Sequence, residues 1–354
     1  MKKILFITIA CAGLLTANAQ VNTTPKNTTK ITSIQTPGEF KDYMRKAQAG
    51  DNDAMDKVAG AYFEGKGVAK NHQEAFMWWK KAAEAGNYLS MFDLAECYYY
   101  GEGTPKNYQE AFKWYKKSAE KGHAEAMYSL AECYYSGEGT PRNYQEAFKW
   151  WKKLAEMGDS ESMSDLADCY YYGEGTPKNY QEAFKWWKKL AEKGDSEAMY
   201  LVACCYEDGT GVTKSLPEAF KWYKKAAEAG DKKAMNQLGN YYFYGKVIAK
   251  NYDEAFKWWK KAADKLFPSG IYNVGYAYFY GYGVTKNQQE AFKWWKKAAD
   301  KGDAASMNEL GWCYFLGEGV AKDEVEGIKW WKKGAARGDT NAQKALKDRS
   351  LTWE

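Results

Sequence analysis

Residues 110–117 read Glu-Ala-Phe-Lys-Trp-Tyr-Lys-Lys, and the first three of them recur through the chain at a fixed spacing. Glu-Ala-Phe occurs seven times, each copy 36 residues after the last, and an eighth position at the same step holds Glu326-Gly327-Ile328. The glutamates of the seven copies are Glu74, Glu110, Glu146, Glu182, Glu218, Glu254 and Glu290. A period of about 34 to 40 residues with helical patterning inside it is typical of stacked helical hairpins. The sequence therefore predicts one long repeat array.

The glutamate of each copy lies at the start of a predicted helix, residues 108–121 in the repeat quoted above, which we call the B helix. Asn107 occupies the N-cap position and Glu110 follows three residues later, which predicts a capping box. Gly122 follows the helix and favours the left-handed conformation that ends many helices. The apolar residues form one wide arc and the lysines lie outside it, namely Ala111, Phe112, Trp114, Tyr115 and Ala119 against Lys113, Lys116 and Lys117.

A second helix, the A helix, is predicted to begin near His123 and to run to about residue 136. Its apolar residues have the i, i+3, i+4, i+7 spacing of one helix face: Met127, Leu130, Ala131 and Tyr134. A turn of sequence Gly-Glu-Gly-Thr-Pro follows at residues 137–141 and ends the helix. Neither helix can bury its apolar face alone, so neighbouring hairpins must stack.

Eight A and B pairs fill roughly residues 52–337 of the sequence. A lone B helix before them and a lone, polar A helix at residues 339–347 would cover the two ends of the stack. We therefore expect an all-α solenoid of about eight 36-residue repeats at residues 38–349, with capping helices at both ends and a tail at residues 350–354.

The first nineteen residues have the features of a secretory signal peptide. Lys2 and Lys3 precede an apolar run, and Ala17-Asn18-Ala19 fits a cleavage site. Residues 20–37, which are rich in threonine and lack a helical period, are expected to be a disordered leader. The sequence thus predicts an exported protein, either periplasmic or secreted.

The charge of the chain is small. The formal net charge is +5, and loss of Lys2 and Lys3 with the signal peptide lowers it to +3. So small an excess of positive charge gives no basis for predicting a nucleic-acid-binding stripe. No later segment approaches the run of about 20 apolar residues that spans a bilayer. We expect neither nucleic acid nor a membrane span.

The residues of one repeat resemble those of the Sel1-like repeat family, which is related to tetratricopeptide repeats. The resemblance rests on Met127-x-x-Leu130-Ala131-x-x-Tyr134, on Gly137-x-Gly139, on Glu146-Ala147-Phe148-x-Trp150-Trp151-x-Lys153 and on the closing Gly158. It recurs eight times and covers about four fifths of the chain. It implies a right-handed α/α superhelix of an exported bacterial protein, acting as an adaptor that binds other proteins.

Repeat six departs from this pattern. Its A helix ends in Gly245-Lys246-Val247, without the second glycine, and its B helix is followed by Leu266-Phe267-Pro268 in place of Gly-Asp. Leucine in a left-handed conformation costs about 1 kcal/mol or more. We therefore expect a rebuilt turn and an altered superhelix near residues 245–270.

The sequence offers little for catalysis or for cofactor binding. Its two histidines, His72 and His123, stand at predicted helix starts, and no His-Glu-x-x-His, Cys-x-x-Cys or nucleophile-elbow motif occurs. The repeated glutamates are explained by their place beside N-caps, and the Gly-x-Gly pairs by turns between helices. We expect no catalytic residues, no metal site and no cofactor.

Two positions of the repeat hold the same residue type in many copies and could suggest a function, but we predict that both serve to pack the core. Cys97, Cys133, Cys169, Cys205 and Cys313 share one position, and equivalent positions should be about 9 to 10 Å apart, too far for disulfides. Exported relatives bridge two cysteines within a repeat, whereas each repeat here offers one at this position, so we expect buried free thiols, with Cys204 left open. The tryptophans Trp78, Trp114, Trp150, Trp186, Trp222, Trp258, Trp294 and Trp330 suggest a stacking ladder for a ligand, but an identical column favours a shared core.

The columns that vary from repeat to repeat are more informative. In the repeat quoted above they are the positions of Glu125, Tyr128, Ser129, Glu132 and Ser136, which form one stripe along the A helices. In related superhelices the A helices line the concave side, so the stripe is expected to face a groove. It carries Phe92, Asp93, Glu96, Tyr100, Tyr128, Glu132, Asp165, Asp168, Tyr172, Tyr200 and Asp208, and further along Tyr244, Tyr272, Tyr276, Tyr280, Glu309 and Trp312.

Tyrosines mixed with acids suit an extended or helical protein or peptide partner that carries Lys or Arg and apolar anchors. The sequence thus predicts a non-catalytic, monomeric adaptor. Two alternatives stay open: a binder or hydrolase of cell-wall or β-lactam-type compounds, an activity suggested for some exported relatives, and a structural spacer in an envelope assembly.

Overall fold

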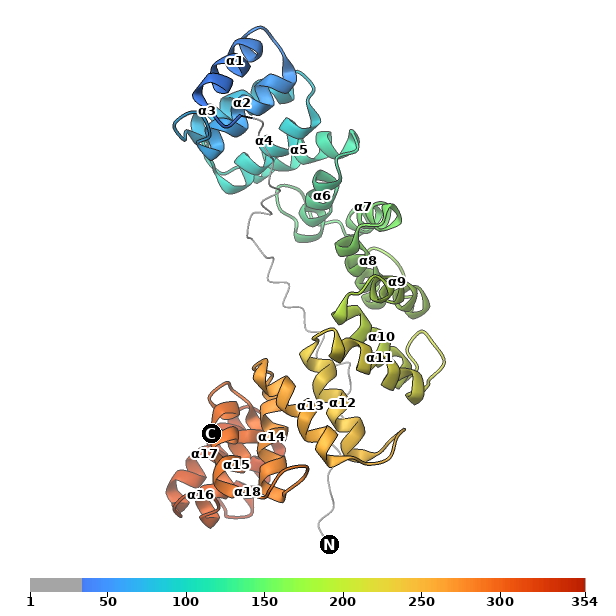
Figure 1. Cartoon of the computed structure of the whole chain (residues 1–354), viewed down its shortest axis with the longest axis vertical. Coiled ribbons are helices and arrows are strands. Elements are labelled where there is room, and N and C mark those ends of the chain that lie inside the picture. The colour runs from blue at the N-terminus through green and yellow to red at the C-terminus, as the bar shows by residue number, and fades with distance from the viewer. Residues whose placement is uncertain (1–33, 354) are drawn as a thin grey trace. The chain divides into compact units, whose positions relative to one another are not determined.

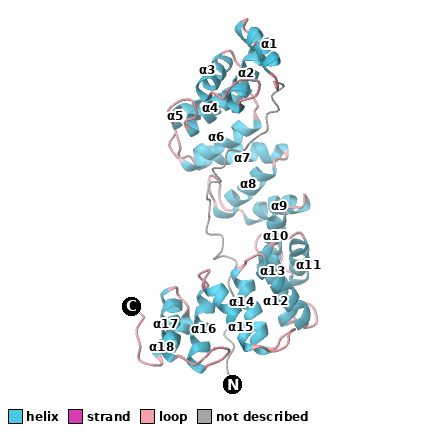
Figure 2. Ribbon diagram, turned by 60° about the vertical axis from the view of Figure 1, so that its left-hand side comes forward, coloured by secondary structure: helices cyan, strands magenta, loops and turns pink. Residues whose placement is uncertain are grey.

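The described part of the chain, residues 34–353 of a computed structural model, is built from helices joined by short turns, and contains no strand (Figures 1 and 2). It divides into two units, unit 1 up to residue 183 and unit 2 from residue 184, and helix α9 (Tyr180–Glu192) crosses the division. The signal peptide expected at residues 1–19 lies outside the described residues, as do residues 20–33 of the expected leader.

Each predicted A and B helix is present. Unit 1 holds α1 (Pro37–Gln48), α2 (Asn52–Glu64), α3 (His72–Glu84), α4 (Tyr88–Tyr100), α5 (Tyr108–Glu120), α6 (Ala124–Ser136), α7 (Tyr144–Met157) and α8 (Ser160–Tyr172). Unit 2 holds α10 (Ser196–Asp208), α11 (Leu216–Glu228), α12 (Lys232–Tyr244), α13 (Tyr252–Asp264), α14 (Pro268–Tyr280), α15 (Gln288–Ala299), α16 (Ala304–Leu316), α17 (Glu324–Ala336) and α18 (Thr340–Lys347). The even-numbered helices are A helices and the odd-numbered ones are B helices. As expected, α1 and α18 are unpaired helices at the two ends.

The capping residues explain where the B helices begin. Asn107 Oδ1 accepts a hydrogen bond from the Glu110 N–H at 3.1 Å, so the N-cap half of the predicted capping box is confirmed. The reciprocal half is wrong in this repeat, because the Asn107 N–H donates to the Tyr98 carbonyl in α4 at 2.7 Å. The Glu110 carboxylate instead accepts from Lys113 at 2.6 Å. The N-cap residue therefore ties each B helix to the A helix before it.

The deepest aromatic column lies one residue beyond the predicted tryptophan column. Its members are Trp79, Tyr115, Trp151, Trp187, Tyr223, Trp259, Trp295 and Trp331, each at most 5 % exposed. The predicted column is only partly core, since Trp78, Trp222, Trp258 and Trp330 are buried whereas Trp114, Trp150, Trp186 and Trp294 are half-buried. A lysine three residues further on covers the outer face of each ring, as Lys117 does at 3.9 Å from the Trp114 ring centroid. The column is therefore a tryptophan–lysine ladder at the edge of the core.

Where the turn after an A helix keeps its second glycine, it brings two main chains into contact. Gly139, at φ 72°, lies so close to the preceding B helix that a Cβ atom would be 2.0 Å from the Tyr108 carbonyl oxygen. Only glycine fits such an approach. The second glycine of the Gly-x-Gly turn thus sets how closely consecutive repeats pack.

The turn at Leu266 corrects an expectation. Leu266 occupies the left-handed region itself, at φ 59°, and its N–H donates to the Ala263 carbonyl at 2.9 Å. Gly86 makes the equivalent bond to Ala83 at 3.0 Å. The turn is therefore not rebuilt, because its two backbone hydrogen bonds are kept and the strain is borne by an exposed leucine.

The expected disorder of residues 20–37 does not extend to their last residues. Ile34 is fully buried, beside Gly67 of the first repeat. Thr36 caps α1, and the reciprocal bonds between Thr36 and Glu39 make a complete capping box. At the other end, Leu351 and Trp353 pack against the cluster formed by α17 and α18.

The cysteines behave as the packing interpretation predicts. Cys133, Cys169 and Cys313 are buried free thiols, and Cys97, Cys204 and Cys205 are buried as well. Burial raises the pKa of Cys133 to about 12, with nearby acids contributing, so this thiol stays protonated at neutral pH. The open question on Cys204 has a structural answer, since the Tyr223 hydroxyl donates to its sulfur at 3.4 Å.

Candidate functional site

The predicted stripe lies on A helices in both units, and each unit is treated separately. Unit 1 carries Phe92, Glu96 and Tyr100 on α4, Tyr128 and Glu132 on α6, and Asp168 and Tyr172 on α8. Unit 2 carries Tyr200 on α10, Tyr244 on α12, Tyr272 and Tyr276 on α14, and Trp312 on α16. Apart from the exposed Tyr172 and Tyr244, these side chains are half-buried, so most of the stripe is a partly covered surface.

In unit 1 the stripe brings a tyrosine and several acids together between α6 and α8. Tyr128 and Asp165 are hydrogen-bonded to each other. Burial raises the pKa of Asp165 well above its usual range, and the neighbouring acids Glu132, Asp168 and Glu161 raise it further. The second oxygen of this carboxyl group, Oδ2, is buried and has no hydrogen-bond partner. The residues around Asp165 therefore favour a proton or a cation.

The α4 residues are engaged in packing. Glu96 accepts a hydrogen bond from the Tyr115 hydroxyl, and burial raises the pKa of Glu96. The Phe92 ring lies 4.9 Å from the His123 ring. Tyr100 lies 5.0 Å from Tyr99, and burial together with Glu96 raises the pKa of Tyr100 to about 12. These side chains join α4 to α5 and to the turn before α6.

The same tyrosine–carboxyl pair occurs in unit 2, where Tyr272 on α14 is hydrogen-bonded to Glu309 on α16. Burial raises the pKa of Glu309 to about 7, and the charge of Asp339 adds to the effect. The two pairs occupy identical repeat positions, yet their surroundings differ. The charges of Glu132, Asp168 and Glu161 act on the pair in unit 1, whereas the pair in unit 2 has the Tyr276 ring 6.5 Å from Tyr272 and feels the charges of Asp339 and Glu318.

A cluster of tyrosines, which we call the tyrosine cluster, surrounds the pair of unit 2 and comprises Tyr244, Tyr252, Tyr276, Tyr280 and Tyr282. The Tyr276 and Tyr280 ring centroids are 4.6 Å apart, and those of Tyr252 and Tyr282 are 4.8 Å apart. Tyr282 also lies 5.9 Å from Tyr276 and 5.8 Å from Tyr280, which joins these four rings into one group. Tyr244 reaches the group through the Phe243 ring, which lies 5.0 Å from Tyr244 and 5.2 Å from Tyr282. Tyr244 and Tyr280 are 48 % and 52 % exposed, so the cluster presents aromatic surface to solvent.

The remaining predicted residues of unit 2 have their own contacts. The Tyr200 ring lies 5.7 Å from the Tyr223 ring, and Lys233 lies 5.7 Å from the Tyr200 ring centroid. Trp312 lies 4.8 Å from Trp331, and Arg349 stands 5.2 Å from its ring centroid. Trp312 is thus partly covered by the end of the chain.

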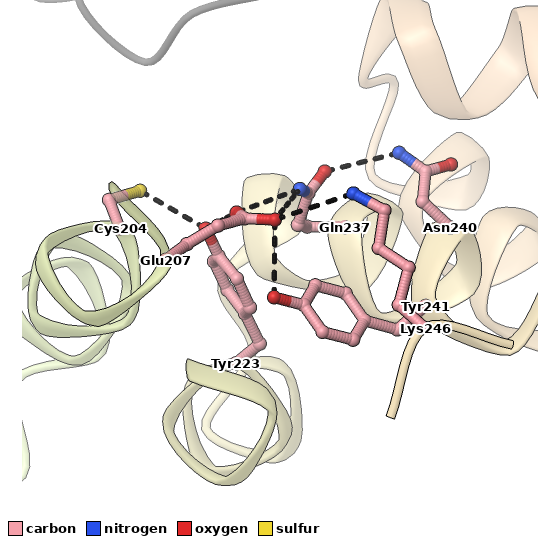
Figure 3. A network of polar contacts seen from close by, with 7 residues as sticks. All are labelled: Cys204, Glu207, Tyr223, Gln237, Asn240, Tyr241 and Lys246. Carbon is pink, nitrogen blue, oxygen red and sulfur yellow. Dashed lines mark hydrogen bonds and ion pairs between the residues drawn. The ribbon is translucent and has the colours of Figure 1, made fainter. Parts of the chain in front are cut away.

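A polar network around Glu207, between α10, α11 and α12, was not predicted (Figure 3). Glu207 accepts from the Tyr223 hydroxyl at 2.7 Å, the Tyr241 hydroxyl at 3.1 Å and the Gln237 amide at 3.1 Å. Lys246 Nζ lies 3.7 Å from the same carboxylate. Because the carboxylate already has these partners, the network joins repeats five and six rather than offering a vacant binding site.

This network explains the departure of repeat six at Lys246. In other repeats an A-helix tyrosine donates to the glutamate of the next turn, as Tyr99 does to Glu138 at 2.5 Å and Tyr135 to Glu174 at 3.0 Å. At the corresponding positions in repeats five and six stand Glu207 and Lys246. The turn residue has changed together with its partner. The sequence signal was Glu207 itself, an acid in a column that is otherwise Tyr or Phe.

The B-helix surface is rich in lysine, but the charges there are balanced. The first lysine of each Lys-x-x-Lys-Lys run pairs with the N-terminal glutamate, as Lys221 does with Glu218 at 2.6 Å, and the third covers a tryptophan. Some second lysines pair with an acid four residues on, as Lys296 does with Asp300 at 2.8 Å. Hollows of about 650 and 460 Å³ lie beside Trp222 and Trp114.

Within residues 34–353 no group of three or more His, Cys, Asp or Glu side chains is arranged to hold a metal ion. The helices in the same range are too short or too polar to cross a membrane.

The comparisons with known proteins agree with the fold. The Sel1 repeat family model matches residues 52–87, 89–123, 124–159, 160–195, 196–231, 232–265, 268–303 and 304–339. The crystal structure of a protective antigen of uropathogenic Escherichia coli strains that displays an SLR fold is 30% identical, with a TM-score of 0.77, over 88% of this chain and 68% of that chain. A Sel1 repeat protein from Oxalobacter formigenes is 26% identical, with a TM-score of 0.75, over 88% of this chain and 90% of that chain. No curated protein matched the sequence. With eight consecutive matches across most of its length, the chain belongs to the Sel1 repeat family.

Proposed function

We propose that this chain is an adaptor that binds a protein or peptide partner through the stripe of its A helices, with the tyrosine cluster of unit 2 as the main anchor. Sel1 repeats commonly mediate protein interactions, and proteins of this family are typically non-catalytic scaffolds. The exposure of Tyr280 within a group of touching rings, and of Tyr244, which reaches that group through Phe243, carries the proposal. Tyrosine is enriched among the residues that dominate binding energy at interfaces.

The surroundings of the cluster indicate the chemistry of the partner. Burial raises the pKa of Tyr280, and Glu309 and Glu318 contribute through their charges. Acids beside tyrosine faces favour a cation, which gains from both the charges and the ring quadrupoles. The partner is therefore a basic segment that also carries apolar side chains to pack against the rings.

A peptide-display selection tests this proposal. The full chain is screened against random peptides, and the enriched peptides are titrated against the wild type and a Tyr244→Ser, Tyr280→Ser variant. Both tyrosines are exposed, so the variant should fold, which circular dichroism verifies. Loss of each anchor is expected to weaken binding by roughly tenfold or more.

The matched control is Tyr88→Ser, which removes a tyrosine of similar exposure, 44 %, from α4 in unit 1. The proposal would be supported by enriched peptides that contain Lys or Arg, bind the control variant as they bind the wild type, and bind the double variant more weakly. Peptides that bind all three proteins equally, or no enrichment at all, would refute the assignment to the tyrosine cluster.

The proposal includes export as a monomer to the periplasm or the medium, because residues 1–19 have the charged start, apolar run and small-residue cleavage pattern of a signal peptide. N-terminal sequencing of the protein from a fractionated bacterial host tests it. A mature chain that starts at Gln20 is the expected result, and an intact Met1 in the cytoplasmic fraction would contradict it.

A further inference from the structure

The acidic group between α6 and α8 stands out among the carboxyl groups of the described residues. Its central carboxyl group, that of Asp165, is hydrogen-bonded to Tyr128 but still has one buried oxygen without a hydrogen-bond partner. The Glu207 carboxylate of unit 2, by contrast, has three donors and a lysine. A buried polar atom left without a partner destabilises the folded state, and more so when it is charged. A structure that keeps such an atom points to a group that satisfies it.

The charge around Asp165 identifies the kind of group. Glu132 lies on α6, Asp168 and Glu161 lie on α8, and each raises the pKa of the Asp165 carboxyl. These charges disfavour an ionised Asp165, and a cation that carries N–H donors would offset them and supply the missing hydrogen bond. A bare metal ion is a poorer fit, because no group of three ligands in the described residues has metal-site geometry.

We infer that the α6–α8 site binds the ammonium or guanidinium group of a lysine or arginine side chain of the partner, with Asp165 Oδ2 accepting a hydrogen bond from it. The inference rests on the proposed function, since the partner supplies the side chain. It adds a place for a basic side chain in unit 1 to the tyrosine cluster proposed above for unit 2.

The matched pair in unit 2 provides the control for this site. Glu309 occupies the position of Asp165 and bonds to Tyr272 as Asp165 bonds to Tyr128. However, Tyr276, Trp312 and Ala305 stand in unit 2 at the positions that Glu132, Asp168 and Glu161 hold in unit 1. A ligand drawn by the acids should therefore distinguish the two sites, although their tyrosine–carboxyl pairs are the same.

The test uses N-acetyl-arginine amide and N-acetyl-lysine amide, with the neutral N-acetyl-norleucine amide as the reference, titrated into the full chain and followed by NMR. Both cationic amides should shift resonances of α6 and α8, and norleucine amide should not. Asp165→Asn should weaken this binding roughly tenfold, the loss expected for one charge-assisted hydrogen bond. Glu309→Gln should leave it unchanged. Glu132→Gln, which keeps Asp165, should weaken it by a smaller factor.

The carboxyl signal of Asp165 gives a second readout. Bound cation stabilises the charged carboxylate, so its titration midpoint should fall when the amide is added. A midpoint that does not move, equal binding by Asp165→Asn and the wild type, or occupation by Ca²⁺ in place of the amides would overturn the inference. If basic peptides still bind through the tyrosine cluster in that case, the proposed function stands and the assignment to unit 1 fails.

Discussion

Glu309→Gln should remove a pH-dependent loss of folding stability that arises in unit 2. The pKa of Glu309 is raised from 4.5 to about 7, chiefly by burial. Between these two pH values the folded state holds a proton that the unfolded state has lost, so stability falls as pH rises through this window. The penalty is complete above pH 7 and absent below about pH 4.5.

The size of the effect follows from the same two values. Each pH unit between the folded and unfolded pKa is worth about 1.4 kcal/mol, which gives at most about 3 kcal/mol for this carboxyl group. Glutamine is neutral and of the same shape, and its oxygen can still accept from Tyr272. The variant should thus match the wild type near pH 5 and be more stable near pH 8, by as much as about 3 kcal/mol.

Urea unfolding of the full chain at pH 5 and pH 8 measures this difference. Other titrating groups are present in both proteins, so their contributions cancel in the comparison. Glu228→Gln, which changes an exposed glutamate of the same unit, is the control and should show no pH-dependent difference. A variant that is no more stable than the wild type at pH 8, or a Glu309 carboxyl that titrates below about pH 5 by NMR, would refute the reasoning.

Three further substitutions test the packing. Leu266→Gly should raise the free energy of unfolding in urea by about 0.5 to 1 kcal/mol, because it relieves a left-handed leucine at a smaller cost in glycine entropy; an unchanged or lower free energy contradicts this. Gly139→Ala should destabilise far more than Gly122→Ala, because a Cβ at Gly139 meets a carbonyl oxygen at 2.0 Å and one at Gly122 meets nothing within 4 Å; equal losses in urea midpoint would refute this. Lys117→Met should cost about 0.5 to 1 kcal/mol through its contact with Trp114, and a loss erased by high salt would point to charge alone.

Most of the fold could be predicted from the 36-residue period. A 36-residue step fixes where every helix begins, because the N-cap and the turn glycines recur with it, and the structure has those helices at those places. The predictions failed where a residue bonds to another helix rather than to its own sequence neighbours. The N–H of Asn107 bonds to Tyr98 of the preceding helix, which a local capping pattern does not reveal.

The stripe was harder to interpret than the core. Sequence spacing places Tyr128 and Asp165 on one face, but it says nothing of the hydrogen bond between them or of the buried oxygen beside it. The role of Glu207 depends on neighbours from α11, α12 and the turn after α12, which the pattern of its own helix does not reveal. The informative change was a single acid in an otherwise aromatic column, paired with Lys246 in the next repeat.

The contact at Gly139 has a consequence for how the array can change over time. It joins main-chain atoms only, so the distance between neighbouring hairpins of a unit does not depend on which side chains the stripe carries. Substitutions on the stripe can therefore alter what is recognised at one position while the interval to the next stays constant. Within a unit, removing one whole 36-residue period should rejoin the same kind of backbone contact, whereas removing a few residues from a turn should not. Within a unit, the residues that recognise a partner can therefore change while the spacing between repeats stays the same.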